Sequence, residues 1–83
     1  MRGLIFLDMD NKLRQEKLKM WRGNLAQLEK DLVVILEKKG AAAQEGDLSE
    51  NAAYTMAIED ADTTRVRIEE IKKIIRDLEK GEK

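Results

Sequence analysis

Two carboxylates, Asp47 and Glu50, lie three residues apart in the segment EGDLSENAAY, within the only glycine-flanked polar break of an otherwise helix-forming chain. Residues three apart share one face of a helix. Adjacent carboxylates favour a divalent cation, and Mg²⁺ usually takes one or two protein carboxylates with water and phosphate in the rest of its shell. The spacing is therefore consistent with half of a magnesium site, which a larger enzyme would have to complete.

The same spacing also has a structural interpretation. Asp-x-x-Glu at a helix start is typical of a capping box, in which the Asp47 side chain accepts a hydrogen bond from the Glu50 N–H and Glu50 reaches back to the N–H of Asp47. The two interpretations are compatible, because Asp47 can cap the helix with one oxygen and offer the other to an ion.

The composition excludes several other kinds of site. The 83 residues include no histidine and no cysteine, which removes imidazole catalysis, disulfides and thiolate metal sites. The net charge of -1 gives no overall attraction to nucleic acid or to an acidic membrane. The apolar run at residues 4–7 is too short for a secretory core or a membrane span. We expect a soluble, cytoplasmic protein with no membrane partner, and no feature indicates a self-contained enzyme.

Two heptad seams flank the polar break, with apolar residues at alternating steps of three and four, as in a coiled coil. The first seam consists of Leu18, Trp21, Leu25, Leu28, Leu32 and Ile35, and the second of Tyr54, Ala57, Ala61, Thr64, Ile68, Ile71, Ile75 and Leu78. Gly40 and Gly46 allow the positive φ angles that end helices and turn chains. The pattern predicts an all-α fold, a long antiparallel two-helix coiled-coil hairpin with its turn at about residues 40–48.

Pairing the seams about the turn predicts which residues are neighbours. Ile35 should lie near Ala57, Trp21 near Ile71, and Leu18 near Ile75. Small residues of the second helix near the turn allow a narrow end, whereas the bulky pairs lie toward the open end. Arms of roughly 30 residues would make a rod about 45 Å long, a shape that suits a probe better than a pocket.

The hairpin is expected to cover residues 13–80, and residues 1–12 would overhang the end of the second helix. The apolar residues of this overhang have nothing within the hairpin to cover them. They are either frayed or bind a partner. A homodimer is one such possibility, formed through Leu4, Ile5, Phe6, Leu7 and Met9 together with an outer apolar stripe of Leu13, Met20 and Val34.

The segment EGDLSENAAY, followed by Ala57, Glu59 and the string Arg67-Ile68-x-Glu70-Ile71, resembles the N-terminal coiled-coil domain of the Gre family of bacterial transcript cleavage factors. The specific match covers roughly residues 44–72, and the first helix shares only the heptad pattern. The resemblance implies that the hairpin enters the secondary channel of bacterial RNA polymerase. There Asp47 and Glu50 would help to hold a Mg²⁺ ion shared with the polymerase, and would orient a water for hydrolysis of the RNA 3′ segment.

In the function that the resemblance implies, the polymerase remains the nuclease and the hairpin is an accessory factor. The hairpin alone would bind no ion tightly and needs no other cofactor. Asp47→Ala or Glu50→Ala should then abolish the stimulation of cleavage without unfolding the rod.

Four more tip residues are candidates for contact with the polymerase, namely Leu48, Ser49, Asn51 and Tyr54. Each also has a structural interpretation. Leu48 could close the end of the core, and Ser49 is an ordinary hydroxyl for a first helical turn. Asn51 could shape the turn with a local hydrogen bond, and Tyr54 could pack in the second seam.

Two of the departures from the family pattern affect the expected function. Ala43 and Ile58 stand where many family members have basic residues, so contact with the RNA 3′ end is expected to be indirect. The sequence stops at Lys83, where the linker to the family's C-terminal globular domain would begin, so that domain is not expected here. Two alternative functions stay open: a structural, dimerising coiled coil, and a regulator that occupies the channel without cleavage.

Overall fold

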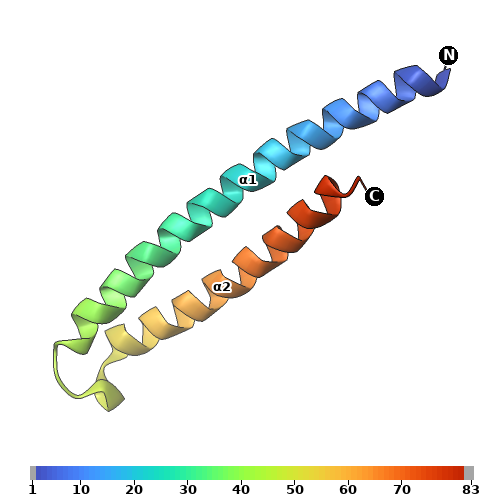
Figure 1. The fold of residues 1–83 in the computed structure, drawn as a ribbon. Coiled ribbons are helices and arrows are strands. Elements are labelled where there is room, and N and C mark those ends of the chain that lie inside the picture. Colours follow the sequence, from blue (N-terminus) through green and yellow to red (C-terminus); the bar gives the residue numbers. More distant parts are fainter. Residues whose placement is uncertain (1, 82–83) are drawn as a thin grey trace.

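Two long helices make up the chain. Helix α1 spans Arg2–Ala43, the single-turn 3-10 helix η1 spans Leu48–Glu50, and helix α2 spans Ala52–Glu79. The computed structural model describes residues 2–81, and the side chains of residues 11–81. Helices α1 and α2 run antiparallel and side by side, with η1 at the end where the chain turns (Figure 1). The predicted all-α antiparallel hairpin is confirmed.

The molecule is a thin rod, with extents of 69 × 16 × 13 Å. Its radius of gyration is 19.2 Å, whereas a compact chain of this length would have about 12 Å. At about 1.5 Å per residue, the 42 residues of α1 are half as long again as the 28 residues of α2. Helix α1 therefore continues well past the end of α2 (Figure 1).

The core is the seam between the two helices. On α2 every buried residue belongs to the predicted second seam: Ala57, Ala61, Thr64, Ile68, Ile71 and Ile75. On α1 the large seam residues other than Leu18 are only half-buried. Leu18, Ile71 and Ile75 form the central cluster, and Trp21 and Leu78 are among the residues packed against it. This cluster brings together Leu18 with Ile75 and Trp21 with Ile71, as the seam pairing predicted.

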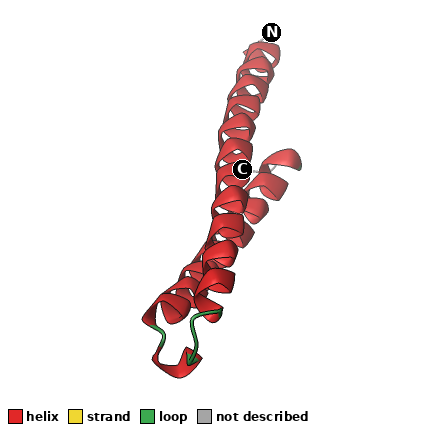
Figure 2. Cartoon of the chain, turned by 90° about the vertical axis from the view of Figure 1, so that its left-hand side faces the viewer, coloured by secondary structure: helices red, strands yellow, loops and turns green. Residues whose placement is uncertain are grey.

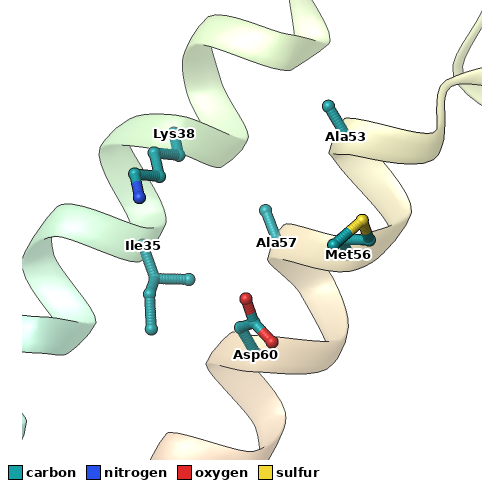
Figure 3. Close-up of a pocket in the computed structure, with 6 residues that line it drawn as sticks. All are labelled: Ile35, Lys38, Ala53, Met56, Ala57 and Asp60. Atoms are coloured by element: carbon teal, nitrogen blue, oxygen red, sulfur yellow. The ribbon is translucent and has the colours of Figure 1, made fainter.

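Near the tip the helices leave a hollow of about 350 Å³ between them. Its lining residues are Ile35 and Lys38 from α1, and Ala53, Met56, Ala57 and Asp60 from α2 (Figure 3). The methyl groups of Ala53 and Ala57 are too small to fill the space opposite Ile35. The predicted neighbours Ile35 and Ala57 thus share one hollow, although the small residues of α2 do not close the gap at this end.

The turn begins later than the glycine positions suggested. Gly40 lies inside α1, and the positive φ angle of the connection is at Gly46, with φ of 117°. Residues 41–43 are alanines, the best helix formers, which offset the cost of about 1 kcal/mol that a glycine adds in a helix. Ala42 is also buried. Helix α1 therefore continues for one more turn, to Ala43.

One ion pair joins the two helices toward their open end. The Arg22 guanidinium lies 2.9 Å from the Glu79 carboxylate, and both side chains are about half exposed. Exposed pairs of this kind contribute at most about 1 kcal/mol. The alignment of the helices therefore depends mainly on the apolar seam.

Candidate functional site at the hairpin tip

The acidic pair lies at an exposed apex. Helix α1 ends in two tight hydrogen bonds, from the Gln44 N–H to the Ala41 carbonyl at 3.2 Å and from the Glu45 N–H to the Ala42 carbonyl at 3.0 Å. Gly46 then reverses the chain, and η1 projects beyond the ends of both helices, with a short loop on either side (Figures 1 and 2). All residues from 43 to 50 are exposed. Both predicted catalytic residues are therefore accessible to a partner.

Asp47 caps η1 and not α2. Its Oδ1 accepts hydrogen bonds from the Ser49 N–H at 3.0 Å and from the Ser49 hydroxyl at 2.8 Å. The Glu50 N–H donates instead to the Asp47 main-chain carbonyl, at 3.4 Å. The predicted capping box is therefore wrong. The physical reason is that the chain closes a separate tight turn before α2 begins, so the Asp47 side chain bonds the N–H two residues ahead, as in an Asx turn.

The turn still leaves both carboxylates usable. The two hydrogen bonds from Ser49 fall on Oδ1, and among residues 11–81, whose side chains the structure describes, none donates a hydrogen bond to Oδ2. The bond that closes the turn links Asp47 to Glu50, and residues at the two ends of such a turn have Cα atoms within about 7 Å. An ion placed at the apex could therefore be reached by both side chains.

Hydrogen bonding from Ser49 lowers the pKa of Asp47. The side-chain hydrogen bond is the largest cause, the backbone N–H of Ser49 is the second, and a slight desolvation acts in the opposite direction. A hydrogen bond to the charged form of a carboxyl favours that form. An exposed aspartate is a carboxylate at neutral pH in any case, so the main consequence of these hydrogen bonds is a fixed orientation of the Asp47 side chain.

Replacing Ser49 should raise the pKa of Asp47 toward its ordinary value. In Ser49→Ala the hydroxyl that contributes most to the lowering is lost, whereas Ser49→Thr keeps a hydroxyl and should keep the lowered pKa. Because the folded-state pKa is depressed, Asp47 contributes stability above its unfolded pKa of about 3.9, and this contribution is lost as the pH falls through the folded-state value. An NMR pH titration of the Asp47 carboxyl tests this. Equal pKa values in the alanine and threonine variants would contradict it.

Asn51 connects the two helices at the base of the tip. Its Oδ1 accepts a hydrogen bond from the Tyr54 N–H at 3.0 Å and so caps α2, while its Nδ2 donates to the carbonyl of Ala42 at 2.7 Å. The expected local hydrogen bond is confirmed. The second bond, to α1, could not be predicted from the sequence, because its partner is a main-chain carbonyl nine residues away. Tyr54 is half-buried, as its place in the seam suggested.

Leu48 does not close the end of the core. Its side chain is 40% exposed, and η1 has no buried residue. The structural interpretation of this residue is wrong because η1 lies beyond the ends of the helices, out of reach of the seam. An apolar side chain at an exposed apex is available for contact with a partner.

The connection and the first half of α2 are strongly acidic, whereas the end of α1 beside them carries Lys38 and Lys39. Residues 40–64 contain no lysine or arginine and six acidic residues: Glu45, Asp47, Glu50, Glu59, Asp60 and Asp62. The remaining residues carry 16 basic and 11 acidic side chains, so the small net charge of the chain hides an uneven distribution of charge along the sequence. The acidic residues of the connection repel RNA phosphates and attract cations.

Among the described residues, the tip offers too few ligands to complete the coordination shell of a metal ion. Over the part of the chain that the structure describes, no group of three or more Asp, Glu, His or Cys residues is placed to hold a metal ion. The same residues contain no helix long and apolar enough to cross a membrane. Carboxylate oxygens are the ligands that Mg²⁺ prefers, so Asp47 and Glu50 fit the ion chemically. They could supply only part of its shell.

The comparison with protein families agrees with this geometry. The family model described as "Transcription elongation factor, N-terminal" (GreA_GreB_N) matches residues 11–79, a range that includes both paired helices and the tip. The comparisons with curated proteins and with solved structures return no match. By the extent of the family match, this chain belongs to the Gre transcription elongation factor family and carries its N-terminal coiled-coil domain.

Proposed function

We propose that the hairpin enters the secondary channel of bacterial RNA polymerase tip first and stimulates the polymerase's own Mg²⁺-dependent cleavage of backtracked RNA. The observation that supports this most is the exposed apex, where the hydrogen bonds from Ser49 orient the Asp47 carboxylate through Oδ1 and leave Oδ2 available beside Glu50. The family match places the chain among transcription elongation factors. The site of action would be the cytoplasm, where bacterial transcription takes place.

The shape of the rod supports insertion into a channel. Its cross-section is 16 × 13 Å, whereas a compact chain of the same length would be about 30 Å across. Because η1 lies at the far end of the paired helices (Figure 1), the rod can carry two carboxylates deep into a passage that excludes a globular domain. The exposed side chain of Leu48 would contact the wall of the channel beside them.

In this mechanism the chain supplies ligands and the polymerase supplies the rest. When bound, a second Mg²⁺ acts as a Lewis acid and lowers the pKa of an attacking water. Asp47, through Oδ2, and Glu50 would hold that ion from the channel side. Ser49 keeps Asp47 oriented through its two hydrogen bonds to Oδ1. The acidic residues of the tip disfavour direct contact with RNA phosphates, so contact with the RNA 3′ end would be indirect, and the polymerase would remain the enzyme.

The test is to add the chain to a stalled, backtracked elongation complex of bacterial RNA polymerase in the presence of Mg²⁺. Shortened RNA is the expected result. Competition with a full-length cleavage factor, without any shortening, would replace the proposal by a regulator that only occupies the channel. If the RNA is not shortened and no competition is observed, a structural coiled coil is the remaining function.

We also propose self-association through the outer face of α1. The stripe residues Leu13, Met20 and Val34 are each about half exposed, which is unusual for apolar side chains spaced at exact heptads. The side chains of Leu4, Ile5, Phe6, Leu7 and Met9, the other part of the predicted dimer contact, lie outside the described residues.

Sedimentation of a charged variant tests the self-association. Met20→Glu should lower the association constant by roughly tenfold or more, because a buried unpaired carboxylate costs several kcal/mol. Val66→Glu is the matched control, since Val66 is similarly exposed, at 59% against 51% for Met20, but lies on α2. The prediction is contradicted if the wild-type chain sediments as a monomer up to about millimolar concentration. At that concentration, only an association weaker than about 4 kcal/mol would escape detection.

A further inference from the structure

Asn51 is hydrogen-bonded through each of its polar groups. Besides the two side-chain bonds to Ala42 and Tyr54, its N–H donates to the Leu48 carbonyl at 3.3 Å and its carbonyl accepts from the Thr55 N–H at 3.1 Å. The residue thereby ends η1 and begins α2. A single half-buried side chain thus joins three elements at the base of the tip.

The bond to Ala42 closes the tip into a ring. The Ala42 carbonyl is one of the last of α1, which have no partner within the helix, and it accepts from both the Glu45 N–H and the Asn51 Nδ2. Residues 43–50 therefore protrude from a base that is fixed at both ends. Asp47 and Glu50 lie within this protruding segment, four residues and one residue before Asn51.

Helix capping alone does not explain an asparagine at this position. Aspartate, serine and threonine also cap helices well, but none of them has the amide donor that reaches the Ala42 carbonyl. Aspartate in particular has the shape of asparagine and keeps the oxygen that caps α2. It would place a second acceptor 2.7 Å from the carbonyl, where a donor is needed.

We infer that Asn51 is a positioning residue for the tip carboxylates, acting through its Nδ2 bond to the Ala42 carbonyl. This inference rests on the proposed function, because positioning has a consequence only if Asp47 and Glu50 complete a metal site in the polymerase. A displacement of about 1 Å at a reacting centre can cost roughly 100-fold in rate. Loss of the bond releases the base of the tip while the cap of α2 remains.

The test compares Asn51→Asp with Ala52→Asp in the RNA cleavage assay. Ala52 is exposed and is the first residue of α2, so the control adds the same charge one residue away and leaves the bond to Ala42 intact. Asn51→Asp should lower the maximal cleavage rate by roughly 100-fold, while the concentration for half-maximal effect stays within about twofold of that of Ala52→Asp. A purely structural defect would instead raise that concentration.

A second readout does not depend on the polymerase. In Asn51→Asp the NMR order parameters of residues 44–50 should fall below about 0.6, the range of flexible backbone, while the Tyr54 amide stays protected. In Ala52→Asp they should match the wild type. If the wild-type chain shortens RNA and the two variants behave alike in both assays, the positioning role is overturned and the proposed function stands. If the wild-type chain shortens no RNA, the proposed function fails and the positioning role fails with it.

Discussion

Asp47→Asn and Glu50→Gln should each lower stimulated RNA cleavage by roughly 100-fold or more, because even changes outside the first ligand shell of a metal cost 10–100-fold. Both substitutions keep the size of the side chain and remove its charge. An asparagine Oδ1 at position 47 can still accept the two hydrogen bonds from Ser49, so η1 should persist. Circular dichroism should show unchanged helix content, since both residues lie outside α1 and α2.

Glu45→Gln is the matched control for these two variants. Glu45 is an exposed carboxylate in the same connection, and its replacement removes the same charge from the acidic tip. It should retain cleavage within about twofold of the wild type. If all three variants lose activity equally, the stimulation of cleavage depends on the overall charge of the tip. The assignment of Asp47 and Glu50 as metal ligands is then wrong.

Leu18→Ala should destabilise the hairpin by about 2–5 kcal/mol, the range for a buried leucine truncated in a core. Leu18 is 3% exposed and belongs to the central cluster with Ile71 and Ile75. The total free energy of unfolding of a small domain is about 5–15 kcal/mol, so Leu18→Ala should remove a large fraction of it. Urea unfolding followed by circular dichroism at 222 nm, a wavelength that reports helix, measures it.

Leu36→Ala is the corresponding control on the same helix. Leu36 is 36% exposed and lies off the seam, so its truncation should cost no more than about 1 kcal/mol. Equal losses for the two variants would mean that the stability of the rod is not concentrated in the Leu18 cluster. That result would also remove the basis for the seam pairing at the open end.

The hairpin could be predicted because its cause is periodic. The second seam contains all the buried residues of α2, from Ala57 to Ile75. Apolar residues spaced three and four apart indicate a buried helix face from the sequence alone. The antiparallel pairing followed from the short connection alone. The exposed position of Asp47 and Glu50 followed from the same argument, since the turn of such a hairpin has no third element to cover it.

The local structure of the tip could not be predicted in the same way. Gly40 suggested an early end to α1, but the alanines that follow it and the burial of Ala42 extend the helix. The spacing of Asp47 and Glu50 fits a capping box, but the cap of α2 is Asn51. Each outcome depends on a competition between hydrogen bonds of similar strength, which spacing does not decide.

The Mg²⁺ dependence of RNA cleavage shows whether the hairpin tip delivers metal ligands to the polymerase. A backtracked complex is titrated with Mg²⁺ with and without the wild-type chain, and the shortened RNA is measured at each concentration. Two added carboxylates should shift the half-maximal Mg²⁺ concentration downward by roughly tenfold or more, and Asp47→Asn should return it to the value without the chain. Stimulation with an unchanged Mg²⁺ dependence, or no stimulation at saturating chain, would contradict the delivery of metal ligands by the hairpin tip.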